Sequence, residues 1–200
     1  AATTGEQNTA VGFSALEDLT TGSYNTAIGI EAGRNVTTGS SNTIVGRNAM
    51  DGVVTGSSNV AVGSQALNAS TSGDDNTAVG TYAMGGNTTG NYNTAVGRDA
   101  LGSNTTARDN VAIGYKALTT NSTGDQNTAV GYQALRLSTT AENNTAVGHE
   151  ALHHSTTGAD NTAVGAATLD ANTTGNNNVA LGKSALSANT TGHRNTAVGT

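Results

Sequence analysis

One short pattern of apolar and polar positions recurs along the whole chain. A pentad, Asn-(Thr/Val)-Ala-Val-Gly with small variations, begins at Asn8, Asn25, Asn42, Asn59, Asn76, Asn93, Asn110, Asn127, Asn144, Asn161, Asn178 and Asn195. Every interval spans seventeen positions, with no insertion or deletion. Because one extra residue would shift all later copies out of register, this regularity indicates a structural array of stacked units.

The repeat unit reads N-[TV]-A-[VIL]-G-x-x-A-[LM]-x-x-x-T-T-G-x-x, and its positions are numbered here from the Asn as position 1. Seventeen residues are too few for two helices and a turn, and Thr-Thr-Gly disfavours a helix. The pattern therefore predicts an all-β chain, a β-solenoid or β-roll of about twelve 17-residue coils. Residues 1–200 form a single tandem-repeat segment, expected to belong to a longer array. Coils about 4.8 Å apart give a rod roughly 55 to 60 Å long.

Strand alternation places unit positions 2 and 4 on one face of each pentad and positions 1, 3 and 5 on the other. Position 4 is aliphatic in every copy, so we assign it to the coil interior, together with the Leu at position 9. The predicted core is Val11, Ile28, Val45, Val62, Val79, Val96, Ile113, Val130, Val147, Val164, Leu181 and Val198. The small Asn-Ala-Gly face is then covered by another chain. In the rival interpretation that small face is the interior, and the valines contact neighbouring chains.

The Asn at position 1 stacks on itself once per coil. Its amide is expected to bond to the copies above and below, as in cross-β stacks. All twelve pentad asparagines are predicted to form this structural ladder. Gly at positions 5 and 15 marks corners at which the chain turns.

Composition supports a thin core and narrows the possible partners. Only 31 of the 200 residues are Leu, Ile, Val or Phe, too few for one globular core of this length. The chain has no Cys, and therefore no disulfides or thiolate metal sites. A net charge of −6 argues against a nucleic-acid partner. No long apolar run or signal peptide is present, so we expect no membrane insertion.

The sequence offers little chemistry. Charged residues occupy variable unit positions without a recurring carboxylate pair, so no catalytic residue, no cofactor and no enzyme activity are expected. Three histidines, His149, His153 and His154, fall in one unit and could ligate a metal, but they are interpreted as exposed loop residues on two edges of the coil. Calcium-binding repeats are absent, and no metal site is predicted.

Three surface features bear on ligands. Tyr115 and Tyr132 share a unit position and should stack. The two threonines of each unit are adjacent, so on a strand they point to opposite faces. Each face then carries only one column of threonines along the rod, here called a Thr file, which is a weak pattern for ice binding. Five sequons fall at position 12, which we place on an outward edge open to glycosylation: Asn87, Asn104, Asn121, Asn172 and Asn189. The alternative is that Asn-Thr-Thr-Gly is turn and solubility chemistry.

The pentad followed by Ala-Leu, as in residues 127–135, resembles the repeats of trimeric tail fibres of phages and related bacterial surface fibres. It is more distantly similar to the head repeats of trimeric autotransporter adhesins, to which residues 110–114 come nearest. The resemblance implies parallel homotrimers, extracellular display on a cell or virion, and attachment to surfaces.

We therefore expect a structural shaft of an extracellular fibre, a surface filament or a phage tail fibre, that serves adhesion and carries sugars on some repeats. Its partners would be copies of itself, as a homotrimer or filament, and cell-surface glycans. The alternative is a ligand-binding solenoid, either a glycan-binding adhesin or an ice-binding protein.

Overall fold

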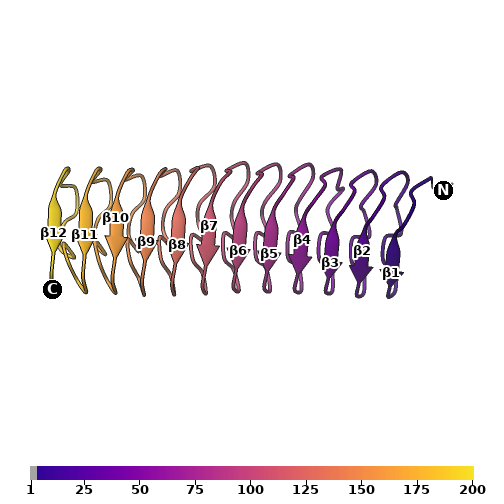
Figure 1. Cartoon of the computed structure of the whole chain (residues 1–200), viewed down its shortest axis with the longest axis horizontal. Helices are drawn as coiled ribbons and strands as arrows, with labels where there is room; N and C mark the ends of the chain where they lie inside the picture. The colour runs from indigo at the N-terminus through magenta and orange to yellow at the C-terminus, as the bar shows by residue number, and fades with distance from the viewer. Residues whose placement is uncertain (1–3) are drawn as a thin grey trace.

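The computed structural model describes residues 4–200, which form a straight rod of stacked coils with one short strand in each (Figure 1). The strands are β1 (Thr9–Val11), β2 (Thr26–Ile28), β3 (Thr43–Val45), β4 (Val60–Val62), β5 (Thr77–Val79), β6 (Thr94–Val96), β7 (Val111–Ile113), β8 (Thr128–Val130), β9 (Thr145–Val147), β10 (Thr162–Val164), β11 (Val179–Leu181) and β12 (Thr196–Val198). The described residues contain no helix. The predicted β-solenoid with a 17-residue period is confirmed.

All twelve strands belong to one parallel sheet, in sequence order. Each residue pairs with its equivalent in the next coil, as Ala95 does with Ala112 between β6 and β7. Backbone hydrogen bonds between coils continue outside the strands. In the Thr file, the amide of Thr88 donates to the carbonyl of Thr105 over 3.0 Å. Coils are thus tied together around most of their circumference, which is why a constant unit length matters to the array.

Left-handed backbone residues close each coil within a single repeat unit. Position 5 is always Gly, with φ between +123° and +139°. Positions 7, 9 and 17 carry side chains at φ near +55°, as Asp99, Leu101 and Asp109 do. Such conformations are uncommon outside Gly, Asn and Asp. The turn formed by positions 5 to 11 therefore does not follow strand alternation.

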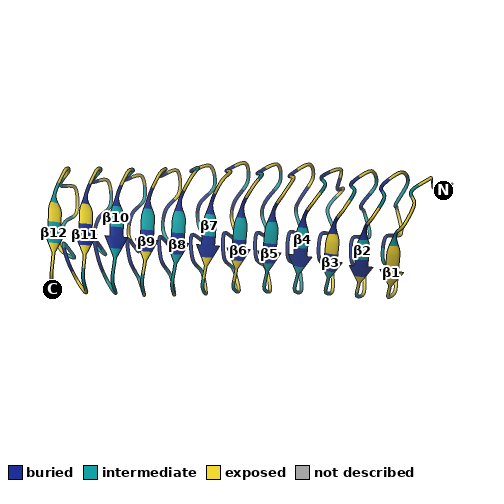
Figure 2. Cartoon of the chain, in the orientation of Figure 1, coloured by how far each residue is buried: buried dark blue, intermediate teal, exposed yellow. Residues whose placement is uncertain are grey.

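The interior of the rod is lined by the small residues, which corrects our assignment of the faces. Alanines at positions 3 and 8, such as Ala95 and Ala100, are fully buried, and so is Leu101 at position 9. The aliphatic residues at position 4 point outward and are exposed or half-buried. This group comprises Val11, Ile28, Val45, Val62, Val79, Val96, Ile113, Val130, Val147, Val164, Leu181 and Val198. Exposed stretches of the strands are visible in Figure 2.

The physical reason is the width of the coil. Position 9 of one coil and position 3 of the next meet in a narrow interior, where an added Cβ on Gly33 would lie 2.7 Å from Ile44 Cδ1. Beside a Leu at position 9 there is room for a methyl group but not for a second branched side chain. Ala at position 3 is thus kept small by the interior of its own chain. The inference that a second chain covers the Asn-Ala-Gly face is wrong, and the rival interpretation, with the valines outside, describes the chain.

Candidate functional site

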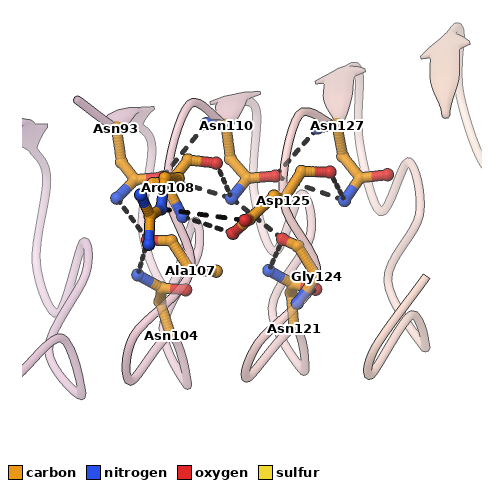
Figure 3. Close-up of polar contacts among 9 residues, drawn as sticks. All are labelled: Asn93, Asn104, Ala107, Arg108, Asn110, Asn121, Gly124, Asp125 and Asn127. Atoms are coloured by element: carbon orange, nitrogen blue, oxygen red, sulfur yellow. Dashed lines mark hydrogen bonds and ion pairs between the residues drawn. The ribbon is translucent and has the colours of Figure 1, made fainter. Parts of the chain in front are cut away.

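The pentad asparagines form a continuous hydrogen-bonded ladder inside the rod (Figure 3). The Oδ1 atom of Asn93 accepts from the backbone amide of Asn110 at 3.1 Å and from its Nδ2 at 3.2 Å. The same two contacts join every successive pair from Asn8 to Asn195. The predicted Asn ladder is confirmed, and it stabilises the array because the side-chain amides of position 1 are paired from coil to coil.

The sequon asparagines at position 12 lie inside the rod, which contradicts their placement on an outward edge. Asn87, Asn104, Asn121 and Asn172 are fully buried, and Asn189 near the C-terminal end is half-buried. Their amides donate to the carbonyl at position 15 of the same coil, for example from Asn121 to Gly124 at 2.8 Å. Asn110 reaches that carbonyl from the other side at 3.0 Å (Figure 3). These asparagines close the coil, and the folded chain does not present them to a glycosyltransferase.

The outer strand face, defined as the side chains at positions 2 and 4, runs along the whole rod. Thr or Val occupies position 2, and Val, Ile or Leu occupies position 4. No charged residue occurs at either position in any coil. In the middle of the rod Val96 is 37% exposed and Ile113 is 40% exposed. The chain thus carries a flat, uncharged, largely aliphatic stripe.

The Thr files are not equivalent. At position 13 the hydroxyl is engaged in the array, as Thr88 Oγ1 donates to the carbonyl of Thr105 at 2.8 Å. Position 14 is exposed in every complete coil, as at Thr89 and Thr106. The hydroxyls of the first file are therefore already paired with protein, which leaves a single exposed file beside it.

A stack of three rings follows position 6 of successive coils. Tyr115 and Tyr132 lie 5.4 Å apart with 19° between their planes, as the sequence predicts. His149 extends the stack, 4.9 Å from Tyr132 at 12°. The sequence interpretation missed its place in the stack, although its position one repeat after Tyr132 would have revealed it. The three rings offer a partly exposed aromatic strip of the kind that packs on sugar rings.

A second column of varied side chains follows position 10. It contains an ion-paired group in which Arg34 lies 2.9 Å from Glu31 and 3.2 Å from Asp51. Further along, Gly85 and Gly102 leave a groove of about 390 Å³ lined by Tyr82, Asp99 and Lys116. The carboxylates of Glu31 and Asp51 are held by a guanidinium, an arrangement typical of structural ion pairs.

His153 and His154 lie with Asp170 farther along the same edge. Nδ1 of His154 is 3.4 Å from Asp170 Oδ1, and Nδ1 of His153 is 3.8 Å from it. Burial, together with the neighbouring His154, lowers the pKa of His153. The sequence interpretation missed Asp170, which stands one repeat after His153 and so occupies the same position in the next coil.

Comparisons with protein-family models, with curated proteins and with solved structures find no match for this chain. Among the described residues, no helix is long and apolar enough to cross a bilayer. Any function must therefore be argued from the repeat and from the surfaces described above.

Proposed function

We propose that this chain is the shaft of an extracellular fibre, a surface filament or phage tail fibre that serves attachment. The observation that carries the proposal is the unbroken ladder from Asn8 to Asn195, which joins every coil to the next by the same bonds. Such an array becomes longer by the addition of coils, and it can hold two parts of a fibre at a fixed distance from each other. Its binding surfaces are shallow, whereas small-molecule sites are usually concave and enclosed.

The outer strand face supports association of the shaft with further copies of itself. Single proteins rarely expose contiguous apolar patches larger than a few hundred Å². Here an aliphatic stripe follows all twelve strands, although other exposed positions carry charges freely. A second copy of this chain has the same axial spacing and the same lack of charge. Its outer strand face can therefore match the first, side chain for side chain.

The resemblance to trimeric fibres favours three parallel copies around a shared threefold axis. Each copy would turn its outer strand face inward, so that the valines form a shared core between chains. The thin interior of each coil, built from Ala, Leu and Asn, would then be supplemented by apolar burial at the interface. Extracellular display follows from the same resemblance.

Sedimentation velocity at micromolar concentration tests the association. The test variant is Val79→Lys with Ile113→Lys, which places two charges two coils apart on the outer strand face. The control is Thr89→Lys with Thr123→Lys, at the same separation along the exposed file at position 14. Wild type and control should associate, and the test variant should sediment as a folded monomer. A wild-type chain that is itself a stable monomer would contradict the proposal.

The alternative, a glycan-binding adhesin, is favoured by one observation, the partly exposed stack of Tyr115, Tyr132 and His149. A glycan array with wild type and Tyr132→Ala would examine it. Binding that is lost in the variant would support recognition by the shaft itself. If wild type binds no glycan, attachment must be carried out by other parts of a fibre.

A further inference from the structure

Three potential ligand atoms converge at the position-10 edge of two adjacent coils. They belong to His153 and His154 in the coil of β9 and to Asp170 in the coil of β10, and all lie within 4.8 Å of one another. His154 Nδ1 and Asp170 Oδ1 are 3.4 Å apart. A tetrahedral Zn²⁺ with bonds of about 2.0–2.2 Å separates its ligand atoms by about 3.3–3.6 Å.

The backbone of the solenoid holds these side chains in place. His153 and Asp170 share a unit position, so stacking of the coils sets their separation. The backbone amide of His154 donates to the carbonyl of Asp170 at 3.1 Å, which locks the two coils at this point. The two imidazoles meet edge to face, with ring centres 4.5 Å apart. The His153 side chain is only 13% exposed and has little freedom to turn away.

Arg136 lies beside Nε2 of His153, and because a guanidinium can only donate, Nε2 is the acceptor of this contact. Its guanidinium Nη1 lies 3.5 Å from His153 Nε2, on the side of the ring away from Asp170. Nδ1 of His153 and Nδ1 of His154 both face the carboxylate of Asp170, at 3.8 Å and 3.4 Å from its Oδ1. Nδ1 of His154 also lies 3.1 Å from the backbone carbonyl of Asp170, which can only accept a hydrogen bond. A metal ion bound at these two nitrogens therefore displaces a proton from each of them. Glu150 adds a second negative charge near His153, which offsets part of the charge of Arg136.

We propose that His153, His154 and Asp170 bind a divalent transition-metal ion, with Zn²⁺ as the reference ion. Two imidazoles and one carboxylate are ligands that Zn²⁺, Cu²⁺ and Ni²⁺ accept in proteins, whereas Mg²⁺ and Ca²⁺ prefer an all-oxygen set. Water completes the coordination shell on the exposed side of His154, whose side chain is 49% exposed. The ion clips two neighbouring coils together, and so acts on the stability of the rod.

Isothermal titration of the full chain with ZnCl₂, after removal of metal by a chelator, measures the site directly. The test variants are His154→Gln and Asp170→Asn, which retain size and polarity at partly exposed positions. The controls are His149→Gln and His193→Gln, since those two histidines lie outside the cluster. Wild type and both controls should bind one Zn²⁺ with micromolar affinity, and each test variant should bind at least about tenfold more weakly.

Two further readouts separate coordination from a loss of folding. Circular dichroism in metal-free buffer should show the same fold for all five proteins, and Zn²⁺ should raise the melting temperature of wild type but not of Asp170→Asn. Co²⁺ should give the visible absorption bands of a low-coordinate site with wild type, and these bands should be absent with both test variants. Failure of wild type to bind below millimolar Zn²⁺, or equal binding by His154→Gln and wild type, would overturn the proposal.

Discussion

The side chain of Ile44 fills the space that Gly33 leaves empty in the preceding coil. A Cβ atom added to Gly33 would lie 2.7 Å from Ile44 Cδ1. Gly33 stands at position 9, where every other complete coil has Leu or Met, and Ile44 is the one residue larger than Ala at position 3. The two departures from the repeat therefore compensate each other, and both residues are fully enclosed.

This relationship predicts a measurable coupling. Ile44→Ala should lower the free energy of unfolding by about 2–4 kcal/mol, because it opens a cavity beside Gly33. Gly33→Leu should cost about 1–3 kcal/mol through overpacking. The double variant, which restores the common pattern, should be more stable than the two effects added together by at least about 1 kcal/mol. Since Val36 Cγ2 also lies 3.2 Å from the added Cβ, the recovery should be incomplete. Additive effects in denaturant unfolding would show that the two sites are independent.

With the faces corrected, a charge should destabilise the fold at Ala129 and not at the adjacent Val130. Ala129 is fully buried, whereas Val130 beside it is half-buried on the outer strand face. Ala129→Asp should abolish folding of the central coils, because it places an unpaired charge in a dry interior. Val130→Asp should leave the circular dichroism spectrum intact and weaken only association. Greater thermal destabilisation by Val130→Asp than by Ala129→Asp would restore the original assignment of the faces.

The ladder predicts that exchanging one amide for a carboxylate is costly. Nδ2 of Asn110 donates to Asn93 Oδ1 and to the carbonyl of Gly124. Nδ2 also lies 3.0 Å from the carbonyl of Arg108. Asn110→Asp removes both N–H donors and sets a negative charge against three acceptors, so the free energy of unfolding should fall by about 3 kcal/mol at neutral pH. The matched control is Asn143→Asp, an exposed left-handed residue at position 17, where Asp75 and Asp109 already stand. Equal melting temperatures for the two variants would deny the ladder a stabilising role.

The two recurring glycine corners of the unit should differ in their tolerance of a methyl group. Gly80, at position 5, has φ +134°, and an added Cβ would lie 2.7 Å from the carbonyl carbon of Gly97. Gly90, at position 15, has equivalents in Ala107 and Ala141. Gly80→Ala should cost about 1–3 kcal/mol, because left-handed backbone strain adds to the crowding. An added Cβ at Gly90 also crowds the carbonyl oxygen of Ala107, but without left-handed strain, and the chain accommodates a methyl group at Ala107 and Ala141, so Gly90→Ala should cost less. Thermal unfolding of the two variants compares them, and a Gly80→Ala protein as stable as wild type would refute the argument.

Much of the fold follows from the spacing alone. Twelve pentads at a constant interval require stacked coils, and a polar residue such as Asn110 at a fixed place in each coil requires a ladder. The sequence also identifies Leu101 and its equivalents as core residues, and these are buried. Those inferences depend only on repetition and on the need to pair buried amides, and not on how the chain turns between strands.

The sequence leads to the wrong faces because hydrophobicity alone does not reveal how narrow the interior of the coil is. Val96 is more apolar than Ala95, yet Ala95 is the one enclosed, because a narrow interior that also holds the Leu or Met side chains of position 9 has room only for a methyl group there. Strand alternation counted from Leu101 predicts that the sequon residue Asn104 points outward, but Leu101 has φ +51° and the alternation of a strand does not apply there. A left-handed Leu carries no sequence signal, since its residue type disfavours that conformation. In the candidate metal cluster, His153 and His154 can be identified because they are neighbours in the sequence. Asp170 can be identified only because it lies one 17-residue repeat after His153.

Mass per unit length of the fibre, measured by scanning transmission electron microscopy, tests the central claim most directly. One chain contributes about 0.35 kDa per Å, since each 17-residue coil climbs about 4.8 Å. A shaft of parallel copies joined by their outer strand faces should give a whole multiple of that value, about 1 kDa per Å for three chains. A two-chain value would keep the association and contradict the trimer. Rods with the mass per length of a single chain would contradict the shared valine core altogether.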